Sequence, residues 1–447
     1  MSAAPDTAFF ERCRAVLAEH PGFVPTGRAS ALVGDVLEAE GLSARVGSIC
    51  RVEPHDGPGF HAEVIGFRDG RFILMPLGEC AGFGPGTRVR VVRDAASLSV
   101  DESWLGRVVD GLGRPLDGGS APGAETEVPL YRASEPPLRR MPISKPLDVG
   151  VRSINGLLTV GRGARMGIFS GSGVGKSTLL GQIARNTDAD VNVIALVGER
   201  GREVREFVEN DLGSSLERSV VVVATSDEAP LLRVRAAYVA TALSEYFRAR
   251  GSHVLLLMDS LTRFCTALRE IGLAAGQPPA TRGYPPSMWA QLPKLLERAG
   301  NSPAGGSVTG IYTVLMEGDD PNDPVTDAAR SLLDGHVLLS RTLSEQGQFP
   351  PVDPLASVSR VMDRVVPDEH VVRAREARRA LATYERAHDL ISIGAYVEGS
   401  DPEIDRARRL RGPLRAFVSQ GRDEACTLAE SQAALANALG EIRGEAA

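Results

Sequence analysis

Continuous apolar runs alternate with helical segments through the middle of the chain. Between residues 151 and 345 the runs MGIF, VNVIALVG, SVVVVAT, HVLLLMD and SVTGIYTVLM show no regular alternation of apolar and polar positions. Strands that are buried on both faces have this pattern, whereas strands with one face in water alternate. The pattern therefore predicts an α/β core built on a parallel sheet.

The segments on either side of this core follow other patterns. Residues 27–92 consist of short alternating runs separated by Gly, Pro and Asp, which predicts a small antiparallel barrel. The pair Asp69-Gly70 between two of these runs predicts a hairpin turn. Residues 93–150 are rich in Gly and Pro, so we expect a connection there. After about residue 370 the strand signals end, and VVRAREARRALATYERAHDLI and DRARRLRGPLRAFVSQ predict helices.

The first residues of the chain predict a short amphipathic helix. Apolar side chains recur at helical spacing at Phe9, Phe10, Cys13, Val16 and Leu17. The pattern breaks at Pro21-Gly22. A terminal helix of this kind either docks onto a partner or packs on its own protein, and periodicity alone leaves both possibilities open.

Length, net charge and cysteine content limit the classes of protein to which this chain can belong. A chain of 447 residues is too long for one ordinary core, so two or three domains are expected. The net charge of −7 gives no global basic footprint for nucleic acid. The 5 cysteines are scattered without a CxxC pair, which argues against a disulfide framework or a zinc site and favours a reducing compartment. We see neither a secretory signal nor an apolar membrane span, so we expect a cytoplasmic protein that reaches a membrane only through partners.

The sequence GSGVGKST at residues 171–178 carries the strongest chemical signal. Glycines there let successive backbone N–H groups turn towards an anion, and the following helix TLLGQIAR adds its positive N-terminal end. This is a P-loop (Walker A) pattern, in which Lys176 reaches the β- and γ-phosphates of ATP and Ser177 binds Mg²⁺. Ser170 stands where the general pattern has its first glycine, and a small side chain is tolerable there. A glycine-rich turn without nucleotide is disfavoured because strand, loop and helix all agree. The predicted phosphate cradle comprises Gly171, Ser172, Gly173, Val174, Gly175, Lys176, Ser177 and Thr178.

Two carboxylates follow other apolar runs of the same predicted sheet. Asp259 ends HVLLLMD, where it could hold Mg²⁺ through water, although a lone Asp at this place is often only a helix cap. Glu199 ends VNVIALVGE, and the carboxyl ends of parallel strands meet at one crevice. A carboxylate there could polarise the attacking water. Spacing alone leaves open whether Glu199 does so or instead forms an ion pair with Arg200, Arg202 or Arg205.

Several longer blocks resemble a known family. GVRSINGLLTVGRGARMGIFSGSGVGKSTLL, VGERGREVREF, VLLLMDSLTRF, GYPPSMWAQLPKLLERAG, YTVLMEGDD and SLLDGHVLLSR are similar to the ATPases of type III protein export, which are related to the catalytic subunits of rotary ATP synthases. The resemblance runs from about residue 27 to about residue 430. It implies a P-loop NTPase (RecA-like) core with an N-terminal β-barrel and a C-terminal helical domain. The implied segments are a partner-docking helix at 1–26, the barrel at 27–95, the ATPase core at 96–365 and the helical domain at 366–447.

The same resemblance assigns roles to single residues. Glu199 matches the catalytic carboxylate of the family, and Arg200 and Arg263 match arginines that line the nucleotide site. Arg360 matches an arginine that reaches into the site of the neighbouring subunit, which implies a homo-oligomeric ring, a hexamer by resemblance. Phe349 stands where relatives carry an aromatic residue that stacks on adenine, and stacking needs only the ring face.

The resemblance also implies what the hydrolysis drives. We expect a ring beneath a membrane export gate, at the inner face of the cell membrane, that releases export substrates from chaperones, unfolds them and delivers them. A stator-like regulatory partner would bind the N-terminal helix. The stretch LERSVVVVATSDEAPLLRVRAAYVATALSEYFR favours the flagellar branch over the virulence (injectisome) branch. Two further classes of protein share this core, the catalytic subunit of a rotary ATP synthase and a hexameric nucleic-acid translocase. The few aromatic residues in 27–92 disfavour the translocase, so we expect no nucleic-acid partner.

Overall fold

The computed structural model describes a chain of two compact units. The described residues are Arg14, 26–34, 36–55, 57–78, 80, 82, 84–320 and 323–440. The first unit ends at Ala96 and also includes Ala274–Gly276, and the second comprises Ser97–Leu273 and Gln277–Ala447. The predicted N-terminal helix lies outside the described residues, Arg14 excepted. The four-segment division stays a prediction.

The first unit is a closed antiparallel barrel. Its strands, in spatial order, are β1 (Thr26–Val33), β2 (Val36–Glu40), β5 (Arg71–Pro76), β4 (Phe60–Arg68), β3 (Ile49–Glu53) and β6 (Arg88–Arg93). Val52, Val64 and Leu74 are among the apolar side chains that fill the interior with no exposed surface. Asp69 and Gly70 both have positive φ between the paired residues at the ends of β4 and β5, as a two-residue hairpin turn requires. The predictions of the barrel and of this hairpin are confirmed.

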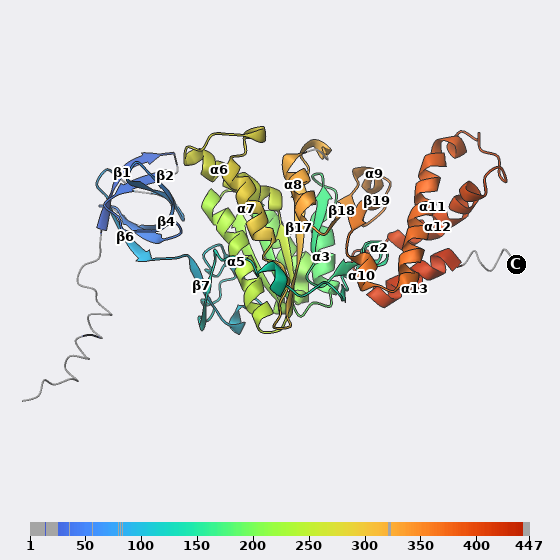
Figure 1. Cartoon of the computed structure of the whole chain (residues 1–447), viewed down its shortest axis with the longest axis horizontal. Helices are drawn as coiled ribbons and strands as arrows, with labels where there is room; N and C mark the ends of the chain where they lie inside the picture. The colour runs from blue at the N-terminus through green and yellow to red at the C-terminus, as the bar shows by residue number, and fades with distance from the viewer. Residues whose placement is uncertain are drawn as a thin grey trace, which may run out of the picture. The chain divides into compact units, whose positions relative to one another are not determined.

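The second unit is built on one large sheet (Figure 1). Its strands, in spatial order, are β19 (Val352–Ser359), β18 (Gly335–Leu339), β12 (Arg165–Ser170), β17 (Ser307–Leu315), β15 (His253–Asp259), β13 (Val191–Glu199), β14 (Ser219–Thr225) and β8 (Val108–Asp110), and β16 (Gly300–Asn301) pairs with β17. All neighbours from β18 to β8 are parallel, whereas β19 is antiparallel to β18 at the edge. The parallel core predicted from the apolar runs is confirmed.

Short strands and helices complete this unit. The two-stranded pairs are β7 (Ser97–Val100) with β9 (Thr126–Pro129), and β10 (Pro146–Leu147) with β11 (Val160–Gly161). The helices of the sheet region are α2 (Arg152–Leu157), α3 (Lys176–Asn186), α4 (Gly201–Glu206), α5 (Pro230–Ala249), α6 (Leu261–Ala274), α7 (Pro286–Leu296), α8 (Pro324–Leu332), α9 (Arg341–Glu345) and α10 (Met362–Val365). A π-helix, η3 (Phe207–Leu212), follows α4, and the 3-10 turns are η1 (Glu102–Trp104), η2 (Pro137–Arg139), η4 (Gly213–Arg218), η5 (Thr281–Gly283) and η6 (Glu317–Asp319).

The C-terminal part of the second unit is helical, as predicted. It contains α11 (Asp368–Ser392), α12 (Pro402–Val418) and α13 (Leu428–Gly440), which pack on one another and on α2 (Figure 1). Leu410, Leu414 and Phe417 of α12 are buried in the same apolar core as β12 and α3. The helices are therefore joined to the sheet by a continuous hydrophobic core.

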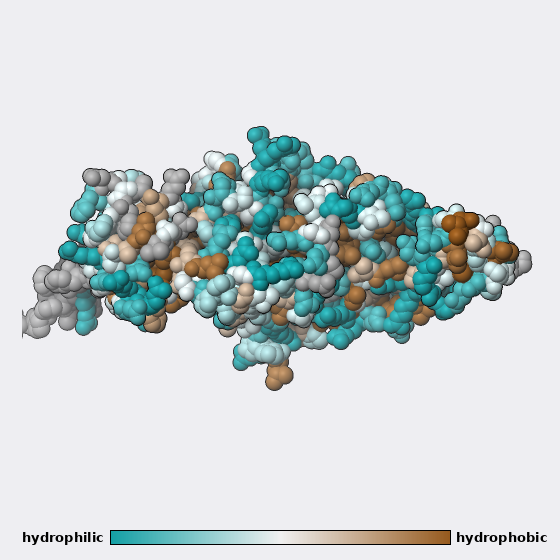
Figure 2. Space-filling view, turned by 90° about the horizontal axis from the view of Figure 1, so that it is seen from above, coloured by the Kyte–Doolittle hydropathy of each residue, from teal (hydrophilic) through white to brown (hydrophobic). Residues whose placement is uncertain are grey.

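The surface is mainly hydrophilic, with apolar groups in places (Figure 2). One apolar group gathers at the end of Figure 2 where the C-terminal helices lie. Leu390, Ile393 and Val397, around the turn between α11 and α12, are 50%, 76% and 70% exposed. None of the helices in the described part of the chain combines the length and apolar character that a membrane crossing needs.

Candidate active site

The loop 171–178 joins the end of β12 to the start of α3. Gly173 and Gly175 have φ of +76° and +94°, a region that favours glycine. A Cβ at either position would meet nothing within 4 Å, so the loop borders open space there. Val174 lies between them but is buried in the core, which anchors the loop from beneath. The loop therefore has the open, glycine-lined concavity that a phosphate group needs.

A cavity of 450 Å³ opens in front of this loop. It is lined from the loop, from the ends of β13 and β14, from the start of α6 and from the end of β17. The lining residues are Gly171, Ser172, Gly173, Gly175, Lys176, Ser177, Thr178, Gly198, Glu199, Arg200, Glu203, Ser226, Ser260, Arg263 and Leu315. The crevice predicted at the carboxyl ends of the parallel strands is therefore present.

Lys176 contacts two carboxylates in the cavity. Its Nζ lies 2.5 Å from Oδ1 of Asp259 and 3.5 Å from Oε1 of Glu199. Burial alone would lower the pKa of Lys176, but the two carboxylates outweigh burial and raise that pKa above its usual value. Asp259 also accepts a hydrogen bond from Oγ1 of Thr313, at 2.7 Å. Because Ser260 rather than Asp259 accepts from the first turn of α6, the Asp259 carboxylate is not a helix cap.

Glu199 has a carboxyl group tuned towards neutral pH. Its pKa is raised to about 7, chiefly by burial, with smaller contributions from the charge of Asp259 and a hydrogen bond with Glu203, while the charge of Lys176 opposes them. A general base is most effective when its pKa is near the working pH. The competing ion pairs of Glu199 do not form, because the arginines pair along their own helix: Arg200 with Glu203, Arg202 with Glu206 and Arg205 with Glu209.

The two arginines predicted to line the site differ in exposure. Arg263 lies in the first turn of α6, where Gly198 makes room for it: a Cβ on Gly198 would come within 2.9 Å of Cβ of Arg263. Arg200 borders the opening, and its side chain is 82% exposed while it bonds Glu203 at 3.3 Å. Gly198 was not among the predicted site residues, although a glycine between an apolar run and an acid is a recognisable signal of close approach.

Phe349 and Arg360 lie outside this cavity in the same chain. Phe349 is 52% exposed on the loop before β19. Arg360 follows β19 and lies at the end of the sheet where β18 and β12 begin. The phosphate loop lies at the other end, where β12 finishes. β12, which has 6 residues, separates these two ends, and its first and last Cα atoms are five steps of about 3.3 Å apart, which is roughly 17 Å. An arginine side chain does not cover that distance, so Arg360 does not meet the phosphate loop of its own chain.

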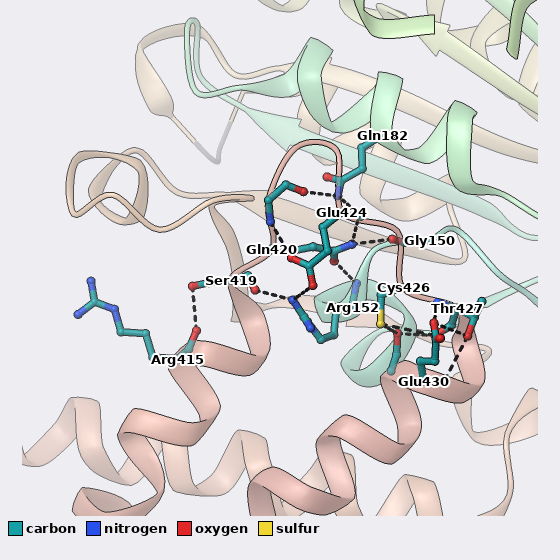
Figure 3. A network of polar contacts seen from close by, with 12 residues as sticks. Gly150, Arg152, Gln182, Arg415, Ser419, Gln420, Glu424, Cys426, Thr427 and Glu430 are labelled. Carbon is teal, nitrogen blue, oxygen red and sulfur yellow. Dashed lines mark hydrogen bonds and ion pairs between the residues drawn. The ribbon is translucent and has the colours of Figure 1, made fainter. Parts of the chain in front are cut away.

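A polar network joins the phosphate-loop helix to the C-terminal helices (Figure 3). Gln182 of α3 donates to the carbonyl oxygens of Gly421 and Glu424, at 3.2 and 3.3 Å. Gln420 is buried, and its carboxamide accepts from the N–H of Arg152 at 2.7 Å and donates to Glu424 O at 2.8 Å. Gln182 and its two acceptors are 239 and 242 positions apart, and Gln420 and Arg152 are 268 apart, so no local pattern marks these pairs.

Two further hydrogen bonds hold segments that carry candidate site residues. The backbone N–H of Gln420 donates to the carbonyl oxygen of Phe349 at 2.8 Å, which fixes the loop that carries this aromatic ring. Arg341, at the start of α9, donates to the carbonyl oxygen of Ser172 at 3.0 Å. Neither Gln420 nor Arg341 was predicted from the sequence.

A glycine-rich phosphate loop between parallel strands, with one lysine and two carboxylates, defines the class of P-loop ATPases.

Comparison with known proteins specifies the family. The nucleotide-binding domain of the ATP synthase alpha/beta family matches residues 150–359, and the C-terminal domain of the T3SS EscN ATPase matches residues 366–437. The flagellum-specific ATP synthase of Pseudomonas aeruginosa is 55% identical over 423 residues, which is 93% of each chain. The type 3 secretion system ATPase of Xanthomonas euvesicatoria is 49% identical, over 89% of this chain and 90% of that one.

Solved structures agree with these relatives. The assembled ATPase EscN of the enteropathogenic E. coli type III secretion system matches with a TM-score of 0.88 and 44% identity, over 92% of this chain and 100% of that one. The same ATPase in complex with its central stalk EscO matches with a TM-score of 0.86. The chain therefore belongs to the family of flagellar and type III secretion ATPases. The predicted fold class, family and ATPase activity are confirmed.

Proposed function

We propose that this ATPase uses Mg²⁺ with its ATP and that it serves the flagellar system of type III protein export. The observation that carries the proposal is the convergence of Lys176, Asp259 and Glu199 on one cavity at the phosphate loop. A lysine for the phosphates and carboxylates for metal and water are the parts that phosphoryl transfer to water needs.

The residues of the cavity fit a nucleotide with its metal ion. The space in front of Gly173 and Gly175 suits a phosphate group, and Lys176 supplies charge to the β- and γ-phosphates. Ser177 lines the cavity, and Asp259 lies behind Lys176, which suits Mg²⁺ held by one hydroxyl, one carboxylate through water, and phosphate oxygens. Bound Mg²⁺ would neutralise charge on the phosphate oxygens.

The other predicted residues would act on the attacking water, on the charge of the phosphates and on the adenine ring. Glu199 orients the attacking water and accepts its proton, and its raised pKa supports this role. Arg263 and Arg200 supply charge at the cavity wall and its opening. Phe349 stacks on the adenine ring, for which its exposed face is available.

Arg360 completes the site of a neighbouring subunit. Its place at the far edge of the sheet supports action in trans, because it is remote from its own phosphate loop. An arginine supplied in trans stabilises charge on the transferring group and is worth roughly 10³–10⁵ in rate. The active form is then a homo-oligomeric ring, and we propose a hexamer. The assembled state of EscN supports assembly of this chain.

The partners follow from the role in export. We propose that the ring lies in the cytoplasm at the inner face of the cell membrane, beneath the export gate. There it would accept chaperone–substrate complexes, and a stator-like regulator would bind residues 1–26. The central stalk bound to EscN supports a further partner at the ring. Neither nucleic acid nor lipid is a proposed ligand.

Lys176→Ala tests the chemistry. We expect this variant to lose binding of a fluorescent ATP analogue and hydrolysis together, while Lys294→Ala, an exposed lysine on α7, behaves as wild type. Wild-type specific activity should also rise with protein concentration as rings form. Undiminished hydrolysis by Lys176→Ala would refute the proposal.

The choice of export system has its own test. Deletion of the gene should abolish assembly of flagellar filaments, and the wild-type gene but not Lys176→Ala should restore swimming. A deletion strain that swims normally but no longer secretes virulence proteins would instead assign the chain to the injectisome.

A further inference from the structure

The backbone and the guanidinium of Arg360 are both hydrogen-bonded to the segment that joins α8 to β18. The backbone N–H of Arg360 donates to the carbonyl oxygen of Asp334 at 2.9 Å. Its guanidinium donates to the carbonyl oxygens of Leu333 and Arg330, both at 3.3 Å, at the C-terminal end of α8. A cation is favourable at that end of a helix. Two donors of the five-donor guanidinium are used in this way, which leaves others for a phosphate oxygen.

Asp334 is in turn fixed to the first residue of β12. Its carboxylate accepts from the backbone N–H of Arg165 at 2.9 Å and from Nε of Arg165 at 3.2 Å. The backbone N–H of Asp334 donates to the carbonyl oxygen of Arg165 at 2.7 Å. Arg165 also bonds Glu297, which bonds Arg140 at 2.6 Å. Asp334 is therefore held by backbone and side chain together, and it carries Arg360 directly.

This anchor is partly buried and tightly packed. The side chains of Arg165 and Asp334 are only 16% and 24% exposed, so water screens the pair less than it screens a surface pair. Gly335, the next residue, has no room for a side chain, because a Cβ would come within 2.4 Å of the carbonyl oxygen of Val358. The close pairing of β18 with β19 thus leaves Arg360 little freedom to shift as long as Asp334 stays in place.

We propose that Asp334 and Arg165 are positioning residues for the trans-acting Arg360. The inference rests on the proposed role of Arg360. Asp334 touches neither the phosphate loop nor the cavity of its own chain, because β12 separates them along its whole length. Loss of the anchor therefore damages the site of the neighbouring subunit and spares nucleotide binding in the subunit that carries the substitution.

The expected effect on kcat is large and the effect on ATP binding is small. Catalytic groups must be held within about 0.5 Å of their working position, and a displacement of about 1 Å can cost roughly 10²-fold in rate. Asp334→Ala should lower kcat roughly 10- to 100-fold, with unchanged affinity for a fluorescent ATP analogue. The milder Asp334→Asn, which keeps an acceptor oxygen for the N–H of Arg165, should lie between Asp334→Ala and wild type.

A matched control is available at the other edge of the sheet. Asp117 pairs with Arg107 at 2.7 Å, with side chains 23% and 17% exposed, and it also accepts from the backbone N–H groups of Val108 and Gly119. Asp117→Ala removes an ion pair of the same burial beside β8. This control should keep the wild-type kcat if the effect of Asp334 is specific to Arg360.

Mixing of two inactive variants separates action in trans from a structural defect. Lys176→Ala subunits cannot bind the phosphates but keep Arg360, whereas Arg360→Ala subunits keep Lys176. In rings of both variants at equal amounts, about a quarter of the interfaces regain a complete site. We expect the mixture of Lys176→Ala with Asp334→Ala to regain activity in the same way.

Each outcome of the mixing test supports or overturns the inference. Recovery in both mixtures, with unchanged ATP affinity, supports it. Recovery with Arg360→Ala but not with Asp334→Ala means that Asp334 acts within its own subunit, which overturns the inference and leaves the proposed function standing. No recovery in either mixture removes the trans role of Arg360, and the inference falls with it. Should Asp334→Ala fail to assemble, Asp334→Asn carries the same mixing test with the same outcomes.

Discussion

Replacement of Glu199 by glutamine should make the nucleotide-free protein more stable while it removes activity. Burial raises the pKa of this carboxyl group from 4.5 to about 7, with the charge of Asp259 adding to the effect. The folded protein therefore holds a proton on Glu199 more tightly than the unfolded chain does. The stability that protonated Glu199 gives the folded protein is fully present below pH 4.5. It is lost as the pH rises through 7, where the charged carboxylate must be kept in the cavity.

The size of the effect follows from this pKa. Because a tenfold change in proton affinity corresponds to 1.36 kcal/mol, the penalty above pH 7 is about 3 kcal/mol. A neutral glutamine of the same shape avoids it and leaves Lys176 paired with Asp259 at 2.5 Å. Gain of stability with loss of function is the usual result when a group is kept in an unfavourable state for catalysis.

The assay is urea unfolding without nucleotide at pH 5 and pH 8. Wild type and Glu199→Gln should differ little at pH 5, whereas at pH 8 the variant should be more stable by up to about 3 kcal/mol. Its ATP hydrolysis should fall by roughly 10²–10⁴, which is typical of a lost general base. The control Glu206→Gln removes an exposed partner of Arg202 and should change neither quantity. Equal stability of Glu199→Gln and wild type at pH 8, or near-normal hydrolysis by the variant, would refute the reasoning.

Three other predictions concern the same unit. For wild type, kcat/KM should fall about tenfold per pH unit below about pH 7, because protonated Glu199 cannot accept a proton, and a pH–rate profile measures this. Phe349→Ala should raise the KM for ATP about tenfold through lost stacking, whereas binding of inorganic tripolyphosphate, which has no base, should be unchanged in calorimetry. Gln420→Leu should lower the free energy of unfolding in urea by about 2–4 kcal/mol, because it removes the bonds of the Gln420 carboxamide to the N–H of Arg152 and to the carbonyl oxygen of Gly150.

The parts that could be predicted are those that local sequence specifies. Gly173, Gly175 and Lys176 lie within one loop, so phosphate binding can be predicted from these residues without any knowledge of the fold. The meeting of Glu199 and Asp259 follows from one added rule, that the carboxyl ends of parallel strands share an edge. The hairpin at Asp69-Gly70 is predictable for the same reason, since only two adjacent residues must accept positive φ.

The parts that could not be predicted depend on distant pairings. Strand β8 has only 3 residues and lies in a stretch that composition marks as a connection, so it has no periodic signal. Strand β19 reverses direction at the sheet edge, a feature that the apolar runs do not encode. Gln420 bonds Arg152 across 268 positions and Gln182 bonds Gly421 across 239, and each of these side chains is an ordinary polar group in its own segment. Only the folded chain shows that they hold the phosphate-loop helix.

The proposed role of Arg360 in trans would make assembly a point of control that is separate from the chemistry. Lys176, Glu199 and Asp259 are already gathered within one chain, so we expect a lone subunit to bind ATP. Arg360 lies about 17 Å away along β12, and in the proposed function its charge serves the site of another copy. Because that charge is worth roughly 10³–10⁵ in rate, a free subunit would keep its ATP almost intact until a neighbour arrives. A partner that only alters how subunits meet, without touching the phosphate loop, would therefore switch hydrolysis on or off.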